Sequence, residues 1–160
     1  MYRHLLVPTD GSNLSRETVQ EAVAFARAIR ARITILHAQQ LQLAVNELLL
    51  EGQAAALTPA LDQRLQEASQ AHAETVLAEA REVAESAGVS CDTITFPTAV
   101  VSEAIIETAD RQGCDLIFMA SHGRRGLAGL VLGSETQRVL CHTEIPVLVH
   151  RHRSLAKGDA

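Results

Sequence analysis

Apolar residues along the chain follow two different spacings, and each spacing predicts one kind of element. Short and nearly continuous apolar runs predict strands at residues 4–7, 33–38, 91–96, 114–120 and 145–149. Apolar residues that recur every three or four positions predict helices after Ser12 and at 59–87, 98–110 and 135–142, with a further short helix at 41–51. Strands that alternate with helices indicate a parallel sheet with right-handed crossovers and helices on both faces.

Composition narrows the class of protein that this pattern describes. The 160 residues are 47% hydrophobic but only 2% aromatic, which predicts one domain with an aliphatic core. We expect this domain to span residues 1–152 and a polar tail to follow at 153–160. A formal net charge of −5 argues against nucleic acid or a membrane as a partner. The chain shows neither a signal peptide nor a membrane-spanning run, so a cytoplasmic location is expected.

The three cysteines show no metal-binding or redox spacing. Cys91 and Cys114 begin predicted strands, and Cys141 stands alone in a predicted helix. We therefore interpret them as free thiols, buried where they start strands, and expect no metal held by protein ligands.

Topology predicts where a ligand would bind before any motif is considered. In an open parallel sheet, ligands bind beyond the carboxyl ends of the strands, at the point where the strand order reverses. This rule brings together the loops at 8–12, 38–40 and 120–134. The third loop is rich in glycine, carries Arg124 and Arg125, and leads into a helix. A strand, a glycine-rich loop and a helix N-terminus form a concavity lined with backbone N–H groups, which favours a phosphate-bearing ligand.

The glycine-rich loop contains neither a Walker A motif nor the dinucleotide fingerprint GxGxxG. It reads Ala120-x-x-Gly123, nine residues, then Gly133-Ser134. This spacing closely resembles the nucleotide-binding signature of the universal stress protein family, in which Gly stands where this chain has Ala120. Other landmarks of that family match VPTDGS at 7–12, ILHA at 35–38 and IPVLV at 145–149.

The resemblance implies a doubly wound, Rossmann-like fold of the adenine nucleotide alpha hydrolase type, with strand order 3-2-1-4-5. It also implies ATP as the ligand, with Mg²⁺ bridging the phosphates. By position, Asp10 would contact the nucleoside, backbone at Ala38 would face adenine, and Gly133 and Ser134 would hold phosphates. The residues expected to line the nucleotide are Pro8, Thr9, Asp10, Ala38, Met119, Ala120, His122, Gly123, Arg124, Arg125, Gly133, Ser134, Glu135 and Thr136.

Several of these residues also have a purely structural interpretation. Asp10 beside a glycine is typical of a turn. Ser134 starts a sequence that fits a capping box, in which its hydroxyl would serve its own helix. Arg124 and Arg125 either clamp phosphates or remain solvated. His122 lacks an evident acidic partner, so we assign no catalytic residue.

The sequence therefore predicts an ATP-binding universal stress protein that acts as a nucleotide-dependent stress-response regulator, with at most slow hydrolysis. The alternatives are a ligand-free dimeric interaction module and an adenine-nucleotide hydrolase, whose SGGxDS loop is absent here. We expect a homodimer formed through the last apolar run, which begins at Ile145 and ends at Val149, because exposed apolar edges favour pairing with another chain. Regulatory protein partners are also expected.

Overall fold

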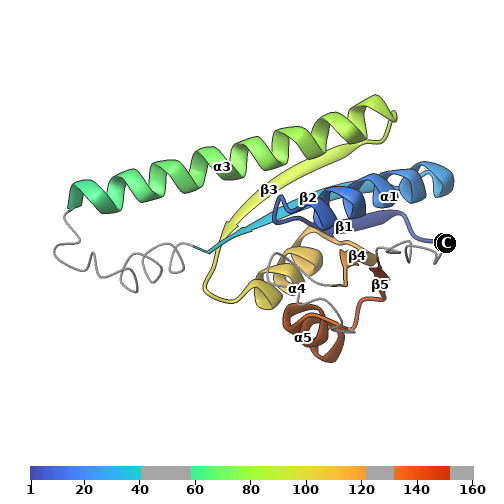
Figure 1. Cartoon of the computed structure of the whole chain (residues 1–160). Helices are drawn as coiled ribbons and strands as arrows, with labels where there is room; N and C mark the ends of the chain where they lie inside the picture. The colour runs from blue at the N-terminus through green and yellow to red at the C-terminus, as the bar shows by residue number, and fades with distance from the viewer. Residues whose placement is uncertain (41–58, 122–131, 152–160) are drawn as a thin grey trace, which may run out of the picture.

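The computed structural model describes residues 1–40, 59–121 and 132–151 and shows five parallel strands in one sheet (Figure 1). The elements are β1 (His4–Pro8), α1 (Asn13–Ile29), β2 (Arg32–Gln39), α3 (Pro59–Ser86), β3 (Cys91–Pro97), α4 (Val101–Gln112), β4 (Leu116–Ala120), α5 (Ser134–His142) and β5 (Val147–His150). The strand order is β3-β2-β1-β4-β5, which confirms the predicted fold class. The short helix expected at 41–51 lies outside the described residues.

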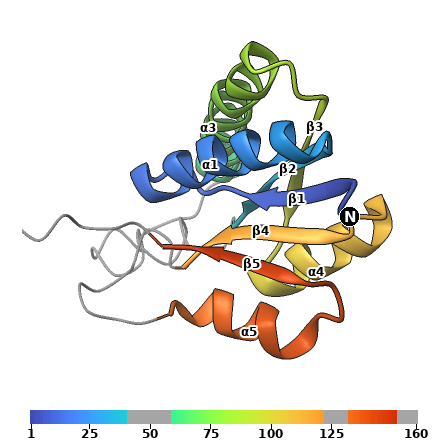
Figure 2. The same cartoon turned by 90° about the vertical axis from the view of Figure 1, so that its right-hand side faces the viewer.

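The helices cover both faces of the sheet. In Figure 2, α1 and α3 lie on one face, and α4 and α5 lie on the other. Leu5 and Val7 of β1 belong to the core beneath α1 and α3, whereas Leu6 belongs to the core beneath α4 and α5. Neighbouring residues of a strand point to opposite faces, so β1 contributes to both cores, and Leu5, Leu6 and Val7 are fully buried.

Several buried or hydrogen-bonded titratable groups lie where the strands begin. The carboxylate of Asp115 accepts hydrogen bonds from the backbone N–H groups of Arg3 and His4. Partial burial raises the pKa of Asp115, but these hydrogen bonds outweigh burial and the net pKa is lowered. Burial lowers the pKa of His4, and it raises the pKa of Cys91 to about 11 and of Cys114 to about 12. Both thiols are free, as expected, and stay protonated at neutral pH. Cys114 is buried as expected, whereas Cys91 is only partly buried.

A tight turn joins β1 to α1. Asp10 Oδ1 accepts a hydrogen bond from Ser12 N–H at 2.9 Å, and Ser12 in turn caps α1 by accepting from Ser15 N–H. Gly11 between them has a φ of +75°, a left-handed conformation that favours glycine. A Cβ atom at Gly11 would lie 2.6 Å from Cγ2 of Val76 on α3. The turn is therefore packed directly against α3.

Replacing Gly11 with Ala tests this contact, and Gly88→Ala is a matched control. Gly88 also has a positive φ, of +71°, but a Cβ atom there meets nothing within 4 Å. We expect Gly88→Ala to lower the free energy of unfolding by about 1 kcal/mol. Gly11→Ala should cost about 1–3 kcal/mol more because it overpacks the contact with Val76. The measurement is equilibrium denaturation of both variants. In a Val76→Ala background, the two substitutions should lower the free energy of unfolding by similar amounts. An equal loss in the wild-type background would contradict the contact between Gly11 and Val76.

Candidate functional site

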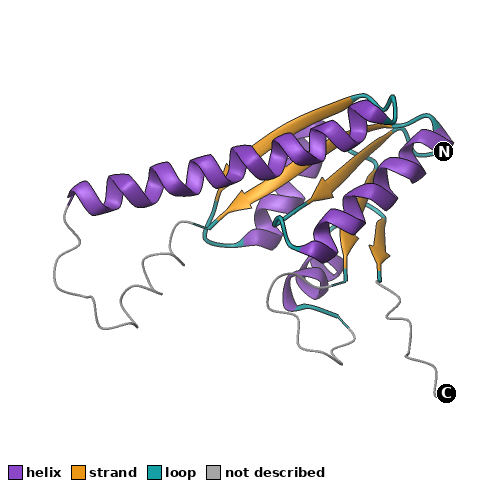
Figure 3. Ribbon diagram, turned by 45° about the horizontal axis from the view of Figure 1, so that its top comes forward, coloured by secondary structure: helices purple, strands orange, loops and turns teal. Residues whose placement is uncertain are grey.

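The carboxyl ends of the strands meet at one edge of the sheet. Figure 3 shows the arrowheads pointing the same way, as parallel pairing requires. The chain winds from β1 to β2 and β3 in one direction and then returns to place β4 on the other side of β1. The strand order therefore reverses between β1 and β4, which is where open parallel sheets bind ligands.

Thr9 holds the first loop of this edge in place. Its N–H donates to the carbonyl of Leu36 on β2 at 2.8 Å, and its hydroxyl lies 3.1 Å from the hydroxyl of Ser15. The hydroxyl also accepts a longer hydrogen bond from Gly11 N–H. Thr9 thus supports the turn that presents Asp10, whose carboxylate closes the same turn. The turn interpretation of Asp10 is confirmed.

The backbone of Ala38 faces the β1 side of β2 at this edge. In a parallel ladder, each residue directs both its N–H and its C=O toward the same neighbouring strand, and successive residues alternate between neighbours. The carbonyl of Leu36 bonds to Thr9 beyond β1, whereas the carbonyl of Gln39 bonds to Thr98 beyond β3. The N–H and C=O of Ala38, two residues after Leu36, therefore point toward the β1 side of β2. At this level of the sheet, strand β1 has already ended.

One face of α3 packs against the end of β2 and the turn after β1. Ser69 accepts a hydrogen bond from the side-chain amide of Gln39 at 2.8 Å. The ring of His72 meets the ring of His37 edge-on, with centroids 5.8 Å apart. Val76 completes the row by packing against Gly11. Positions 69, 72 and 76 lie on one side of a helix, so α3 contacts the ends of both β1 and β2 along one line.

The junction between β4 and α5 forms the third part of the edge. Gly133 N–H donates to the carbonyl of Ser121 at 2.7 Å, and Thr136 Oγ1 donates to the carbonyl of Ala120 at 3.0 Å. These hydrogen bonds hold the start of α5 against the end of β4. The first-turn N–H groups of α5 have no partners within their own helix, which makes this start suited to an anion.

The capping box predicted at Ser134 is wrong. Gly133, in an extended conformation, is the N-cap residue, and Ser134 is the first residue of the helix. Gln137, the reciprocal residue of that pattern, instead donates from its side-chain amide to the carbonyl of Leu132. Glu135, the second residue of the helix, reaches α4. Its Oε2 accepts from Ser102 N–H at 2.8 Å, and its Oε1 pairs with Arg138 at 3.0 Å. The helix α4 has no side-chain cap of its own, so the carboxylate of Glu135 stabilises its N-terminus.

The structure brings most of the predicted site residues to one edge. These are Pro8, Thr9, Asp10, Ala38, Met119, Ala120, Gly133, Ser134, Glu135 and Thr136. Two of them direct their side chains elsewhere: Met119 packs in the core beneath α4 and α5, and Glu135 binds α4. Any ligand contact by these two residues would come from their backbone. His122, Gly123, Arg124 and Arg125 lie outside the described residues.

Sequence reasoning missed the role of His37. Its Nδ1 lies 3.0 Å from the carbonyl oxygen of Thr9, and its side chain is only 7% exposed. In the sequence, His37 stands within the apolar run at 33–38, where a histidine is typical of a packed position. A histidine directly before the residue expected to face adenine was the available signal.

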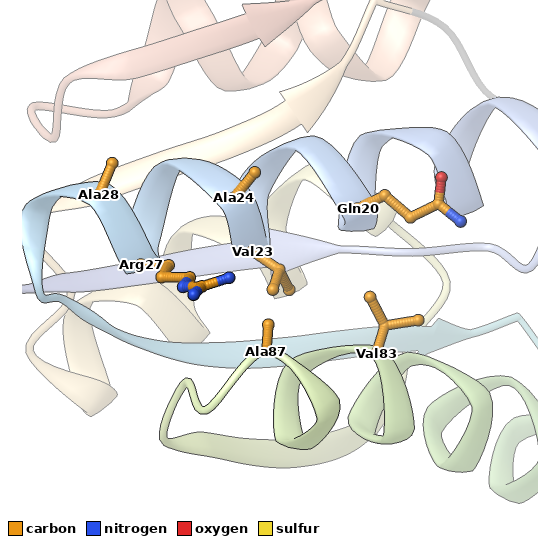
Figure 4. Close-up of a pocket in the computed structure, with 7 residues that line it drawn as sticks. All are labelled: Gln20, Val23, Ala24, Arg27, Ala28, Val83 and Ala87. Atoms are coloured by element: carbon orange, nitrogen blue, oxygen red, sulfur yellow. The ribbon is translucent and has the colours of Figure 1, made fainter.

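A separate shallow groove lies between α1 and α3, away from this edge (Figure 4). It is lined by Gln20, Val23, Ala24, Arg27, Ala28, Val83 and Ala87. These residues belong to the later part of each helix, toward the end of the molecule where the strands begin. Over the three described ranges, no cluster of three potential metal ligands occurs, and no helix is long and apolar enough to cross a membrane.

The fold defines an α/β protein of the Rossmann-like class, whose strand order reverses between β1 and β4. The chain belongs to the universal stress protein family, whose model matches residues 1–151. It is 30% identical over 149 residues to universal stress protein MJ0531 of Methanocaldococcus jannaschii, across 93% of this chain and 82% of that protein. The solved structure of universal stress protein UspA from Lactobacillus plantarum is 26% identical, with a TM-score of 0.72 over 94% of this chain and 98% of that chain.

Three more distant structures of this fold contain an adenine nucleotide. A universal stress protein in complex with cAMP is 24% identical, with a TM-score of 0.64 over 94% of this chain and 97% of that chain. The protein from Archaeoglobus fulgidus in complex with dAMP is 14% identical, with a TM-score of 0.62 over 92% and 97%. A family member from Arabidopsis thaliana with AMP bound is 15% identical, with a TM-score of 0.66 over 95% and 93%.

The hydroxyl of Thr136 provides a test of the β4–α5 junction. Thr136→Val keeps the shape of the side chain but removes the donor to the carbonyl of Ala120, whereas Thr136→Ser keeps the donor. Thr136 is only 2% exposed. We therefore expect Thr136→Val to lower the free energy of unfolding by about 1–2 kcal/mol, and more than Thr136→Ser does. Equilibrium denaturation measures both variants, and a larger loss for Thr136→Ser would contradict the importance of the hydrogen bond.

Proposed function

We propose that this protein binds an adenine nucleotide, ATP with Mg²⁺, in the crevice between β1 and β4. The observation that supports this most strongly is the pairing of two features at one edge of the sheet. Ala38 directs its N–H and C=O beyond the end of β1, and α5 begins beside the end of β4. The first feature suits the edge of a base, and the second suits a phosphate.

The backbone of Ala38 is suited to adenine in particular. Adenine carries an acceptor, N1, beside a donor, its 6-amino group, and one residue's N–H and C=O can match both. Guanine has the opposite pattern on the same edge, so it would place donor against donor and acceptor against acceptor. The cAMP, dAMP and AMP held by the three family members support adenine as the base.

The start of α5 is suited to the phosphates. Gly133 has a φ of −71° and a ψ of 155°, values that residues with a side chain also adopt. The backbone conformation therefore does not require glycine, and we infer that the missing side chain leaves space for a phosphate. The Mg²⁺ ion would be held mainly by phosphate oxygens and water, as this ion commonly is.

The proposed role is that of a cytoplasmic stress-response regulator whose nucleotide state changes its interaction with other proteins. Hydrolysis would be slow at most, because phosphoryl transfer needs a group that orients the attacking water. Asp10 is engaged in the turn and His37 binds Thr9, so neither is placed as a dedicated base in the described part of the site.

We also propose a homodimer formed through β5. Both β3 and β5 are edge strands, but they differ in composition. The strand β3 carries Asp92 and ends at Pro97, features that discourage pairing at an edge. The strand β5 reads VLVH and is only half-buried. Pairing of two β5 strands about a two-fold axis would cover this apolar edge.

Calorimetric titration with Mg-ATP and Mg-GTP tests the proposed ligand. We expect micromolar binding of ATP near one per chain and roughly 10- to 100-fold weaker binding of GTP, because guanine leaves the Ala38 groups mismatched. Gly133→Val should weaken ATP binding by at least about tenfold while changing the free energy of unfolding by less than about 1 kcal/mol. Failure of the wild-type protein to bind ATP would refute the proposal and favour the ligand-free interaction module.

A charge placed on each edge strand tests the dimer. Val149→Asp should yield monomers, because two β5 strands would then bring like charges together in an apolar contact. Thr95→Asp on β3 is the matched control, and it should leave the dimer intact. Analytical ultracentrifugation measures the mass of each variant, after circular dichroism has shown that it is folded. A dimer that survives Val149→Asp and is lost with Thr95→Asp would move the interface to β3.

A further inference from the structure

We propose that His37 is a positioning residue that keeps the backbone of Ala38 available for the base. Its imidazole ring takes the carbonyl of Thr9 as hydrogen-bond partner and thereby ends the β1–β2 ladder one step early. This inference rests on the proposed function, since it concerns how the adenine site is prepared. The relevant atoms are His37 Nδ1, Thr9 O and the N–H and C=O of Ala38.

The regular ladder would have one more step. Strand β1 pairs with β2 up to Pro8 opposite Leu36, and Thr9 N–H donates to the carbonyl of Leu36 at 2.8 Å. In a parallel ladder, the next hydrogen bond would join the N–H of Ala38 to the carbonyl of Thr9. That bond would use the Ala38 donor which the proposed site assigns to adenine N1.

His37 occupies the acceptor that this step would need. Its Nδ1 lies 3.0 Å from Thr9 O, and a carbonyl oxygen can only accept, so Nδ1 carries the proton. Within the ranges that the structure describes, the backbone hydrogen bonds include none from Ala38 to Thr9. The side chain of His37 therefore takes the place of the backbone N–H of the next residue.

Both partners of this hydrogen bond are held from several sides. His37 is buried at the end of β2, and its ring meets the ring of His72 on α3 at an interplanar angle of 75°. Thr9 is fixed through its N–H to Leu36 and through its hydroxyl to Ser15. Protein groups alone make these contacts, and a preorganised site loses less entropy on binding.

A purely structural role for His37 makes a different prediction. If the ring only provided a hydrogen bond to a buried carbonyl, its loss would lower the free energy of unfolding and weaken the binding of all nucleotides to the same degree. A positioning role predicts a loss of discrimination at the base. Two probes separate these outcomes: ATP and 1-deazaadenosine 5′-triphosphate, in which a C–H group replaces the N1 acceptor while the 6-amino group, the sugar and the phosphates are kept.

The variants are His37→Leu, which cannot donate, and His37→Asn, whose side-chain amide can replace the Nδ1–H donor. His142→Leu is the matched control, because His142 Nδ1 also lies near a backbone carbonyl, at 2.7 Å from that of Arg138, but on the exposed end of α5. We expect the wild-type protein, His37→Asn and His142→Leu to bind ATP roughly three- to tenfold more tightly than the 1-deaza analogue. His37→Leu should bind the two probes equally. Unchanged discrimination in His37→Leu would overturn the inference.

Amide hydrogen exchange in the wild-type protein tests the same point without a substitution. The amide of Ala38 should exchange much faster than the amide of Leu36 when no ligand is present, and it should become protected when ATP binds. Equal protection of both amides before ligand is added would mean that the ladder continues, and it would overturn the inference. A wild-type protein that ignores ATP but shows a fast Ala38 amide would support the early end of the ladder and refute the proposed function alone.

Discussion

The pairing of β1 with β2 on one side and β4 on the other is the constraint on which the rest of the structure depends. Because all three strands are parallel, their carboxyl ends meet at one edge. The chain must leave that edge at Thr9, yet β2 continues to Gln39. Backbone groups that extend beyond a shorter neighbour lose their ladder partners. Because β2 is longer than β1, backbone N–H and C=O groups at the end of β2 have no ladder partner on β1. They lie at the point where the strand order also reverses.

Packing around this edge holds these backbone groups in a fixed position. On one face, α3 contacts Gln39, His37 and Gly11 through side chains that follow one line along the helix. On the other side of β1, Thr136 ties α5 to the end of β4. The carboxylate of Glu135 is turned toward α4, so its negative charge is balanced by a helix N-terminus and by Arg138. The negative charge of Glu135 therefore opposes an anion at the start of α5 less strongly, and the N–H groups of the first turn can bind that anion.

Much of the fold could be predicted from the sequence because its signals are local. Five apolar runs gave the strands, and the Asp-Gly-Ser turn correctly placed the start of α1 at Ser12. The same kind of local pattern failed at Ser134, because Gly133 adopts the cap position and the side chain of Gln137 donates to the carbonyl of Leu132. The carboxylate of Glu135 finds a partner 33 residues away on α4. The bond between His37 and Thr9 spans 28 residues, so no short motif could reveal it. Contacts between distant elements decide where these side chains point, whereas the alternation of strands and helices was enough to locate the edge.

The central claim is that adenine nucleotide binds at the edge between β1 and β4. A map of backbone amide chemical shifts on addition of Mg-ATP tests it most directly. The account predicts that the large changes occur in three places: the turn from Thr9 to Ser12, Ala38, and the first turn of α5 after Gly133. Residues of the groove between α1 and α3, such as Val23 and Ala87, should stay unchanged. Changes confined to that groove, or no changes at all, would contradict the account.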